Sequence, residues 1–199
     1  MLEQIIWLLN ANLSRVENLI GLYGPPVRGR RSVHDTDILR AALVLLHASM
    51  EDFLRSLLVW RAPLGPKDVI DGYPLAGSGR KQPEKFPLGA LVAHRGKTVN
   101  ELIAESVREY LEEFASFNNL GEVKSALVKC GIDHQLVEGH AYGDLPAMIA
   151  RRHKIVHKAD RNDAQGGQGN HTTASIGAAA LQNYLASVRA LRDFARQNL

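Results

Sequence analysis

The chain has 199 residues, of which 45% are hydrophobic and 6% aromatic. This length suits one domain, and the apolar fraction is large enough for a hydrophobic core, which excludes a wholly disordered protein. With 24 Lys and Arg against 21 Asp and Glu, the net charge is only +3. Overall charge therefore gives little reason to expect a polyanionic partner, and the position of the charges matters more.

The sequence also indicates a compartment. The longest apolar runs, such as residues 41–46, are far too short to span a bilayer. The N-terminus lacks the basic stretch and the small-residue cleavage site of a secretory signal, and the single Cys130 excludes an intramolecular disulfide. We therefore expect a cytoplasmic protein with no membrane-spanning helix.

The first two predicted elements are helices. Residues 2–23 carry apolar residues at three- and four-residue spacing, a pattern that stops at Gly24, which two prolines follow. Asp35 or Thr36 is predicted to cap a second helix over residues 37–61, whose dense apolar positions indicate a central, largely buried helix. The connection between the two helices holds a short basic loop with Arg28, Arg30 and Arg31.

Residues 62–97 are predicted to be a loop-rich basic insertion within a single domain of residues 1–199. Six glycines and five prolines interrupt every hydrophobic period, and six Lys and Arg face three acidic residues. The stretch 77–81 superficially resembles a phosphate-binding loop. It lacks the spacing of that motif and no strand precedes it, so we interpret it as a flexible basic turn.

Four further helices are predicted in the C-terminal half. Thr98 and Glu101 form a capping box that opens a helix to about Phe117. A shorter helix over residues 119–130 is closed by Gly131.

The next helix begins at Asp144, with a proline in its first turn, and runs through residues 151–157. A flexible link over residues 162–170 leads to a last helix over about 174–197, capped by Thr172 or Thr173. Because no strand pattern emerges, the fold class is predicted to be all-α, a helical bundle with long loops.

The strongest functional signal lies in residues 151–161, where five Lys and Arg face one Asp and two histidines are added. Arg suits bidentate contact with phosphate oxygens, and His transfers protons near neutral pH. No hydroxyl or thiol nucleophile lies beside the run. The run therefore suits a substrate that supplies its own nucleophile, as RNA does with its 2′-OH.

The spacing Arg152-x-x-x-x-His157, with the polar His153 directly after the Arg, resembles the signature of the HEPN superfamily. The continuation over residues 155–160 is similar to the RiboL-PSP-HEPN branch. The resemblance covers about ten residues in motif and roughly residues 35–199 in architecture. It implies a HEPN-like bundle in which the motif helix lies beside an earlier buried helix, here residues 39–58.

The same resemblance implies a metal-independent endoribonuclease that cleaves RNA by 2′-OH attack to give a 2′,3′-cyclic phosphate, with two motifs meeting in a homodimer. His157 is then the general acid or base, Arg152 stabilises the transition state, and His153 assists. The acidic partner on the earlier helix is Glu51, with Asp52 as the second candidate. The resemblance implies no cofactor and no metal, and it suggests a role as a toxin or defence effector with an antitoxin or operon partner.

The remaining cations of the run are predicted to hold the RNA backbone. They are Arg151, Lys154, Lys158 and Arg161. On a straight helix Arg152 and His157 lie about 140° apart, whereas His153 and His157 lie about 40° apart. A two-fold dimer would relax this mismatch by adding a second copy from the opposite side. For Asp160 two interpretations stay open, as a residue that orients His157 or as a surface residue.

Two competing interpretations remain. The alternative to the endoribonuclease is a catalytically inactive helical module that binds RNA or a protein. His153 and His157 also have the i, i+4 spacing of paired zinc ligands, but Lys154 stands where a zinc protease has Glu and the neighbouring cations repel a dication. Among the scattered histidines, His47 is expected to be a hydrogen-bonded core residue of the central helix.

Overall fold

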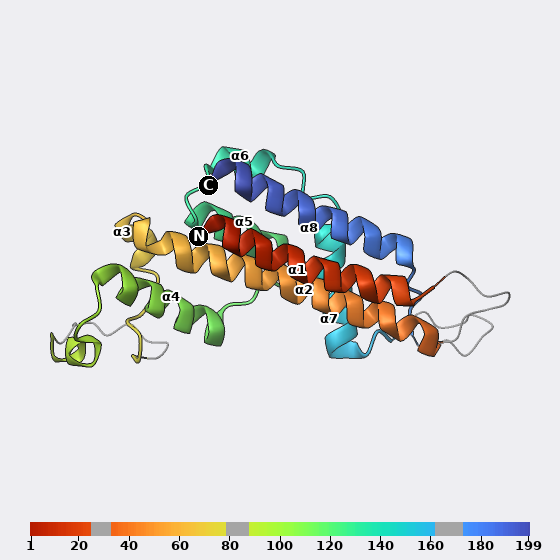
Figure 1. Ribbon diagram of the computed structural model, residues 1–199, viewed down its shortest axis with the longest axis horizontal. Helices are drawn as coiled ribbons and strands as arrows, with labels where there is room; N and C mark the ends of the chain where they lie inside the picture. The colour runs from red at the N-terminus through yellow and green to blue at the C-terminus, as the bar shows by residue number, and fades with distance from the viewer. Residues whose placement is uncertain (25–32, 79–87, 162–172) are drawn as a thin grey trace.

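The computed structural model describes residues 1–24, 33–78, 88–161 and 173–199, and these residues form helices and connecting segments with no β-strand. The prediction of an all-α fold is thus confirmed for the described part of the chain. The N-terminal helix α1 (Leu2–Leu22) lies alongside the long helix α2 (Val33–Arg61), as Figure 1 shows. The other elements are η1 (Ala62–Leu64), α3 (Lys67–Ile70), η2 (Leu88–His94), α4 (Val99–Phe114), α5 (Leu120–Lys129), α6 (His134–Gly139), α7 (Leu145–Lys158) and α8 (Ala178–Asn198).

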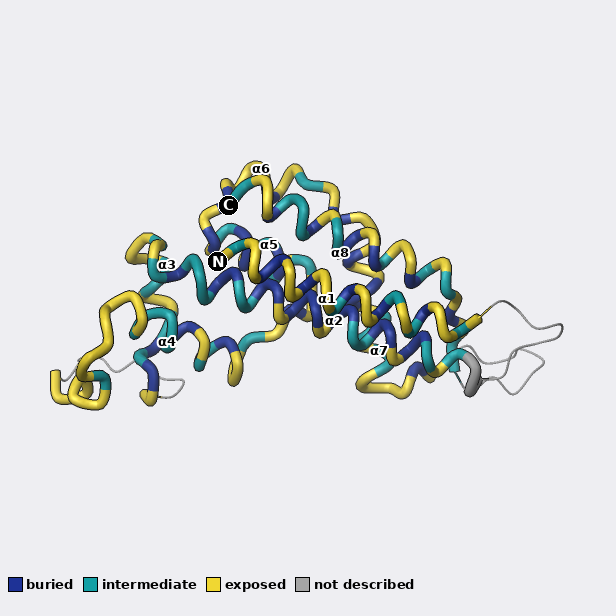
Figure 2. Tube along the Cα trace, viewed as in Figure 1, coloured by how far each residue is buried: buried dark blue, intermediate teal, exposed yellow. Residues whose placement is uncertain are grey.

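Helix α2 is the centre of the fold. It contacts α1, α4, α5, α7 and α8, and the dark blue buried positions follow it for most of its length in Figure 2. Its Leu, Met and Phe side chains recur every three to four residues, so nearly all of its faces exclude water. The wholly buried members are Leu39, Leu43, Leu46, Met50, Leu54 and Leu57. This core fixes α4 near the C-terminal end of α2 and α7 nearer its N-terminal half (Figure 1).

The predicted start of α2 was wrong. The helix includes Val33, so Asp35 and Thr36 lie inside it and do not cap it. The Thr36 hydroxyl instead accepts a hydrogen bond at 2.6 Å from Nη1 of Arg40, one turn later. A side chain of the same helix, four residues later, therefore engages the hydroxyl that was predicted to cap it.

Local signals in the middle of the chain were read correctly. The capping box is present, with the Thr98 N–H donating to Glu101 at 2.7 Å and the Glu101 N–H donating to Thr98 at 3.2 Å. Asn119 caps α5, and Gly131 follows that helix with φ of +96°. Helix α4 ends at Phe114, because Ala115 turns to an extended conformation.

Three segments differ from expectation. The insertion at 62–97 contains η1, α3 and η2, although residues 79–87 lie outside the described residues. Helix α6 was not predicted, although Asp133 caps it with hydrogen bonds from two backbone N–H groups. The last helix begins at Ala178 after Gly177, while Thr173 pairs with Arg161 in an isolated antiparallel bridge.

Several predicted features cannot be compared, since the loop with Arg28, Arg30 and Arg31, the stretch 79–81, the link at 162–170 and Thr172 lie outside the described residues. Among the helices that are described, none has the length and apolar character needed to cross a bilayer.

Candidate functional site

Helix α7 carries the basic run. It opens with Asp144 and Pro146 as predicted, although the Asp144 side chain makes no cap and its N–H donates to the Ser187 hydroxyl at 2.9 Å. Met148 and Ile149 bury the first half of the helix against the core. The last two turns of α7 and the residues after it therefore present the run predicted to be functional.

His153 and His157 lie together on the exposed side of α7. Their ring centroids are 4.4 Å apart, with the ring planes inclined at 43°. Both side chains are exposed, as is Val156 between them. The shared face predicted from helical geometry is confirmed, and it places two imidazoles where one phosphodiester can reach both.

Arg152 is half-buried and points elsewhere. Its Nη1 donates to the Asn118 side-chain oxygen at a long 3.4 Å, and the charge of its guanidinium lowers the pKa of His47 on α2. Arg152 thus turns away from His157 toward α2 and the connection 115–119, as the angle of about 140° between them requires. We refer to His47, Glu51, Arg55, Asn118 and Arg152 as the inner polar cluster. One chain by itself does not bring Arg152 and His157 together.

The acidic residue of the inner polar cluster is Glu51. It is 8% exposed, its Oε1 accepts the Phe117 N–H at 3.1 Å, and its Oε2 lies 3.7 Å from His47 Nδ1. Asp52 is exposed and lines a groove between α2 and α4 together with Arg55 and Arg108. Of the two candidates named from the sequence, only Glu51 reaches the neighbourhood of Arg152.

Two members of the inner polar cluster, Arg55 and His47, were not predicted as site residues. Both lie on the face of α2 that carries Glu51. Arg55 donates from Nη2 to the Ala115 carbonyl at 2.8 Å and lies over the Phe117 ring. His47 is buried as expected, but neither of its ring nitrogens hydrogen-bonds to any of the described residues. The four-residue spacing of His47, Glu51 and Arg55 was the signal available in the sequence.

The electrostatic environment of His47 favours the neutral imidazole. Desolvation is the largest cause and lowers its pKa from the ordinary 6.5. The Glu51 carboxylate and the backbone of Phe117 act in the opposite direction, while Arg152 and Arg55 lower the pKa further.

The structure excludes both interpretations that the sequence left open for Asp160. Its side chain is 0% exposed, and Oδ2 accepts from Arg40 Nε at 2.8 Å and from Arg151 Nη2 at 2.7 Å. It neither orients His157 nor lies on the surface. The reason is backbone conformation, because Ala159 and Asp160 adopt φ of +48° and +55° and turn the chain back into the core.

Arg151 is committed to the same network. Besides Asp160, its Nη2 donates to the carbonyls of Ala174 and Ser175, each at 3.0 Å. This Arg was expected to hold RNA, but its guanidinium is already engaged within the chain. The other three cations predicted to hold the RNA backbone differ in exposure. Lys154 is half-buried, whereas Lys158 and Arg161 are exposed.

Other chemistries have less support. Among residues 1–24, 33–78, 88–161 and 173–199, no three His, Cys, Asp or Glu side chains gather closely enough to hold a metal ion. Burial raises the pKa of Cys130 to about 12, which leaves no thiolate at neutral pH.

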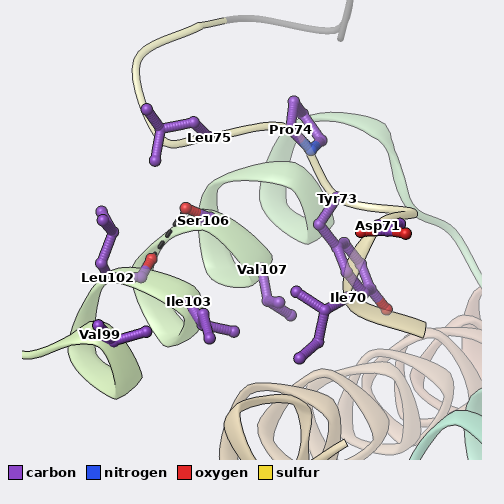
Figure 3. A pocket seen from close by; sticks show the side chains of 10 residues that line it. All are labelled: Ile70, Asp71, Tyr73, Pro74, Leu75, Val99, Leu102, Ile103, Ser106 and Val107. Carbon is purple, nitrogen blue, oxygen red and sulfur yellow. Dashed lines mark hydrogen bonds between the residues drawn. The ribbon is translucent and has the colours of Figure 1, made fainter. Parts of the chain in front are cut away.

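A separate cavity of about 320 Å³ lies between α4 and the segment 70–75 (Figure 3), and α4 lies at a distance from α7 along the bundle (Figure 1). Its lining is mostly apolar, and the Ser106 hydroxyl is occupied by the Leu102 carbonyl and the Ala76 N–H. Of its two ionisable groups, Asp71 is paired with Lys67, and burial raises the pKa of Tyr73 to about 12. The α7 region therefore remains the better candidate site.

Comparison with protein-family models, with curated proteins and with solved structures finds no match to this chain.

Proposed function

We propose that the chain is a metal-independent endoribonuclease of the HEPN type. The observation that carries the proposal is the pair of exposed imidazoles, His153 and His157, on the last turns of α7. Both histidines belong to the Arg152-x-x-x-x-His157 motif. Lys158 and Arg161 add exposed positive charge directly after the pair. This arrangement supplies proton transfer and backbone attraction without a metal.

The proposed reaction needs no nucleophile from the protein. The RNA 2′-OH attacks the adjacent phosphorus, a 2′-O–P bond forms, and the P–O5′ bond breaks. One imidazole takes the 2′-OH proton and another protonates the leaving 5′-oxygen, which gives a 2′,3′-cyclic phosphate and a 5′-OH. Arg152 stabilises the negative charge that develops on the phosphoryl oxygens.

We further propose that the active form is a homodimer with a composite site. Arg152 and His157 leave α7 in different directions, so one copy places the guanidinium and the imidazole apart. A second copy related by a two-fold axis brings the Arg152 of one chain to the His157 of the other. A cytoplasmic location, a toxin or defence role and an antitoxin or operon partner belong to the same proposal.

The second candidate function is a catalytically inactive module that binds RNA or a protein. The long hydrogen bond of Arg152 to Asn118 favours it, because a guanidinium engaged within its own chain is less available to a phosphate. The two functions differ in one respect that is easily measured, the appearance of new RNA ends.

The test is incubation of labelled RNA with the purified protein in EDTA, followed by analysis of the ends. We expect fragments that carry 2′,3′-cyclic phosphate, and His157→Ala should lower the rate by about 10²- to 10⁴-fold, the usual contribution of a general acid or base. His134→Ala removes another exposed imidazole, on α6, and should leave the rate unchanged. If the RNA stays intact, and the wild type and His157→Ala bind it with equal affinity, the chain is a binding module instead.

The composite site has its own test. Arg152→Ala and His157→Ala proteins should each be inactive, whereas an equal mixture, allowed to exchange subunits, should recover about a quarter of wild-type activity, since half the dimers are mixed and each holds one complete site. A mixture as inactive as its components, although mixed dimers have formed, would show that each site uses a single chain.

A further inference from the structure

We propose that Asp160 is a positioning residue for the pair of imidazoles on α7: its buried carboxylate ties the end of that helix to Arg40 of α2 and so holds the turn that carries His157. The catalytic consequence rests on the proposed function, but the structural content can be tested without activity. Asp160 is not a catalytic residue in this proposal, because a side chain with 0% exposure cannot touch RNA.

The side chain of Asp160 connects two helices. One carboxylate oxygen, Oδ2, accepts from Arg40 Nε on α2 at 2.8 Å and from Arg151 Nη2 on α7 at 2.7 Å. Ala174, in the segment that leads to α8, accepts at its carbonyl from both guanidiniums, at 2.9 and 3.0 Å, and its N–H donates to the Asp160 carbonyl at 2.8 Å. We refer to Arg40, Arg151 and Asp160 as the anchor.

The backbone of Asp160 closes the helix that carries the imidazoles. Its N–H donates to the Lys154 carbonyl at 3.1 Å and so reaches back across the turn that contains His157. The carbonyls at the end of a helix lack partners from a following turn, so the contacts of the next residues decide whether the last turn stays closed. Asp160 thus closes this turn through its N–H and fixes it to α2 through its side chain.

The conformation of this helix end has to be held in place. Ala159 and Asp160 adopt φ of +48° and +55°, in the left-handed region that residues other than Gly rarely occupy. Two such residues in succession persist where the surrounding structure holds them. The ion pairs of Asp160 provide such contacts, and without them we expect the turn that carries His157 to open.

The anchor and the imidazoles lie on different sides of α7. Around a helix, Arg151 lies about 160° from His153 and about 120° from His157. The anchor therefore acts through the helix backbone and leaves the side with the imidazoles open to a phosphodiester. Because His153 lies one turn before His157, opening of the last turn should change the separation of their ring centroids, now 4.4 Å.

The experiment compares Asp160→Ala with Leu13→Ala. Leu13 is 1% exposed on α1 and does not belong to the anchor, and the cavity left by Leu13→Ala lowers stability by an amount comparable to the loss of a buried ion pair. The first readout is the NMR cross-relaxation (NOE) between the ring protons of His153 and His157, assigned with the single His→Ala variants. We expect Asp160→Ala to abolish this NOE and Leu13→Ala to keep it.

The second readout is the steady-state kinetics of RNA cleavage. We expect Asp160→Ala to lower kcat by about 10- to 100-fold, the usual cost of a small displacement of a positioned group, and to change KM by less. Leu13→Ala should keep kcat. Asp160→Asn retains one oxygen that can accept from both guanidiniums, so it should recover part of kcat and of the NOE. It also serves as the variant to use if Asp160→Ala does not fold.

The outcomes separate the two proposals. If the wild type cleaves no RNA but the NOE is lost in Asp160→Ala and kept in Leu13→Ala, the positioning role stands and the nuclease proposal fails. If the wild type is active while folded Asp160→Ala and Asp160→Asn keep its kcat and its NOE, the positioning role is overturned and the nuclease proposal is untouched. An equal loss of the NOE in Leu13→Ala would also overturn the positioning role, because general destabilisation would then explain it.

Discussion

The two sides of helix α7 use the same residue types for different purposes. On the core side, Arg151 pairs with Asp160, and Arg152 bonds Asn118 within the inner polar cluster, so that both guanidiniums have a partner within the chain. On the solvent side, the His153 and His157 rings lie against each other at an inclination of 43°, with Lys158 exposed directly after them. A run of adjacent cations is therefore not one cationic surface.

The difference follows from burial. A guanidinium that leaves water needs a carboxylate or several carbonyls to offset its desolvation, and Arg151 has both. An exposed Lys keeps its hydration and remains available to a ligand. Changes on the core side should therefore act on stability first, while changes on the solvent side should act on ligand binding with little effect on stability.

The sharpest way to break this contrast is Asp160→Ala. The substitution removes the one carboxylate that joins Arg40 and Arg151, and breaking a buried ion pair costs about 3–5 kcal/mol; because Arg40 keeps Asp37 and Arg151 keeps two carbonyls, we expect the lower end of that range. Urea unfolding should show a loss of that size in the free energy of unfolding. Asp68→Ala, which removes an exposed carboxylate from α3, should change it by less than about 0.5 kcal/mol. Equal effects of the two substitutions would mean that Asp160 does not hold this network in solution.

A smaller loss is expected for Glu51→Ala. The Phe117 N–H would lose its acceptor inside the protein, which costs about 1–3 kcal/mol. Glu51→Gln keeps an acceptor oxygen and should cost less. The neighbouring Asp52→Ala is the matched control on the same helix, since Asp52 is exposed. If Asp52→Ala lowered the free energy of unfolding as much as Glu51→Ala does, the assignment of Glu51 to the inner polar cluster would be contradicted.

The pH dependence of stability should report on His47. Because desolvation holds its pKa below 6.5, the unfolded chain takes up a proton at a higher pH than the folded chain does. The contribution of neutral His47 to the free energy of unfolding should be complete above pH 6.5. It should be lost as the pH drops through 6.5 toward the lowered folded-state pKa. His47→Leu should flatten this dependence in urea unfolding series, and an unchanged slope would show that His47 is not buried in the neutral form. His140, with a pKa lowered in the same direction, accounts for part of the remaining slope.

The smallest effect on stability is expected on the solvent side of α7. Lys158→Ala should change the free energy of unfolding by less than about 0.5 kcal/mol. It should nevertheless weaken RNA binding and reduce the slope of log affinity against log salt by about 1, the signature of one lost phosphate contact. Fluorescence anisotropy at several salt concentrations measures this slope. A slope equal to that of the wild type would place Lys158 outside the RNA-binding surface.

Local chemistry explains what could be predicted from the sequence. The capping box of Thr98 and Glu101 acts within four residues and the Gly131 stop within one backbone conformation, so the sequence alone located them correctly. Helical periodicity likewise predicted that His153 and His157 share a face. The helix α6 was missed although its cap, Asp133, was visible in the sequence.

Contacts between distant residues explain the rest. Asp160 reaches Arg40 across 120 positions of the chain, and Glu51 reaches Phe117 across 66. No local pattern encodes such partners, and the left-handed backbone at Asp160, which is not a glycine, gave no signal either. The sequence by itself thus determined an all-α chain with a basic motif helix and a pair of histidines on one of its faces. Only the tertiary structure decided which cations of that helix turn inward, because it alone places buried carboxylates and carbonyls where they offset the cost of desolvation.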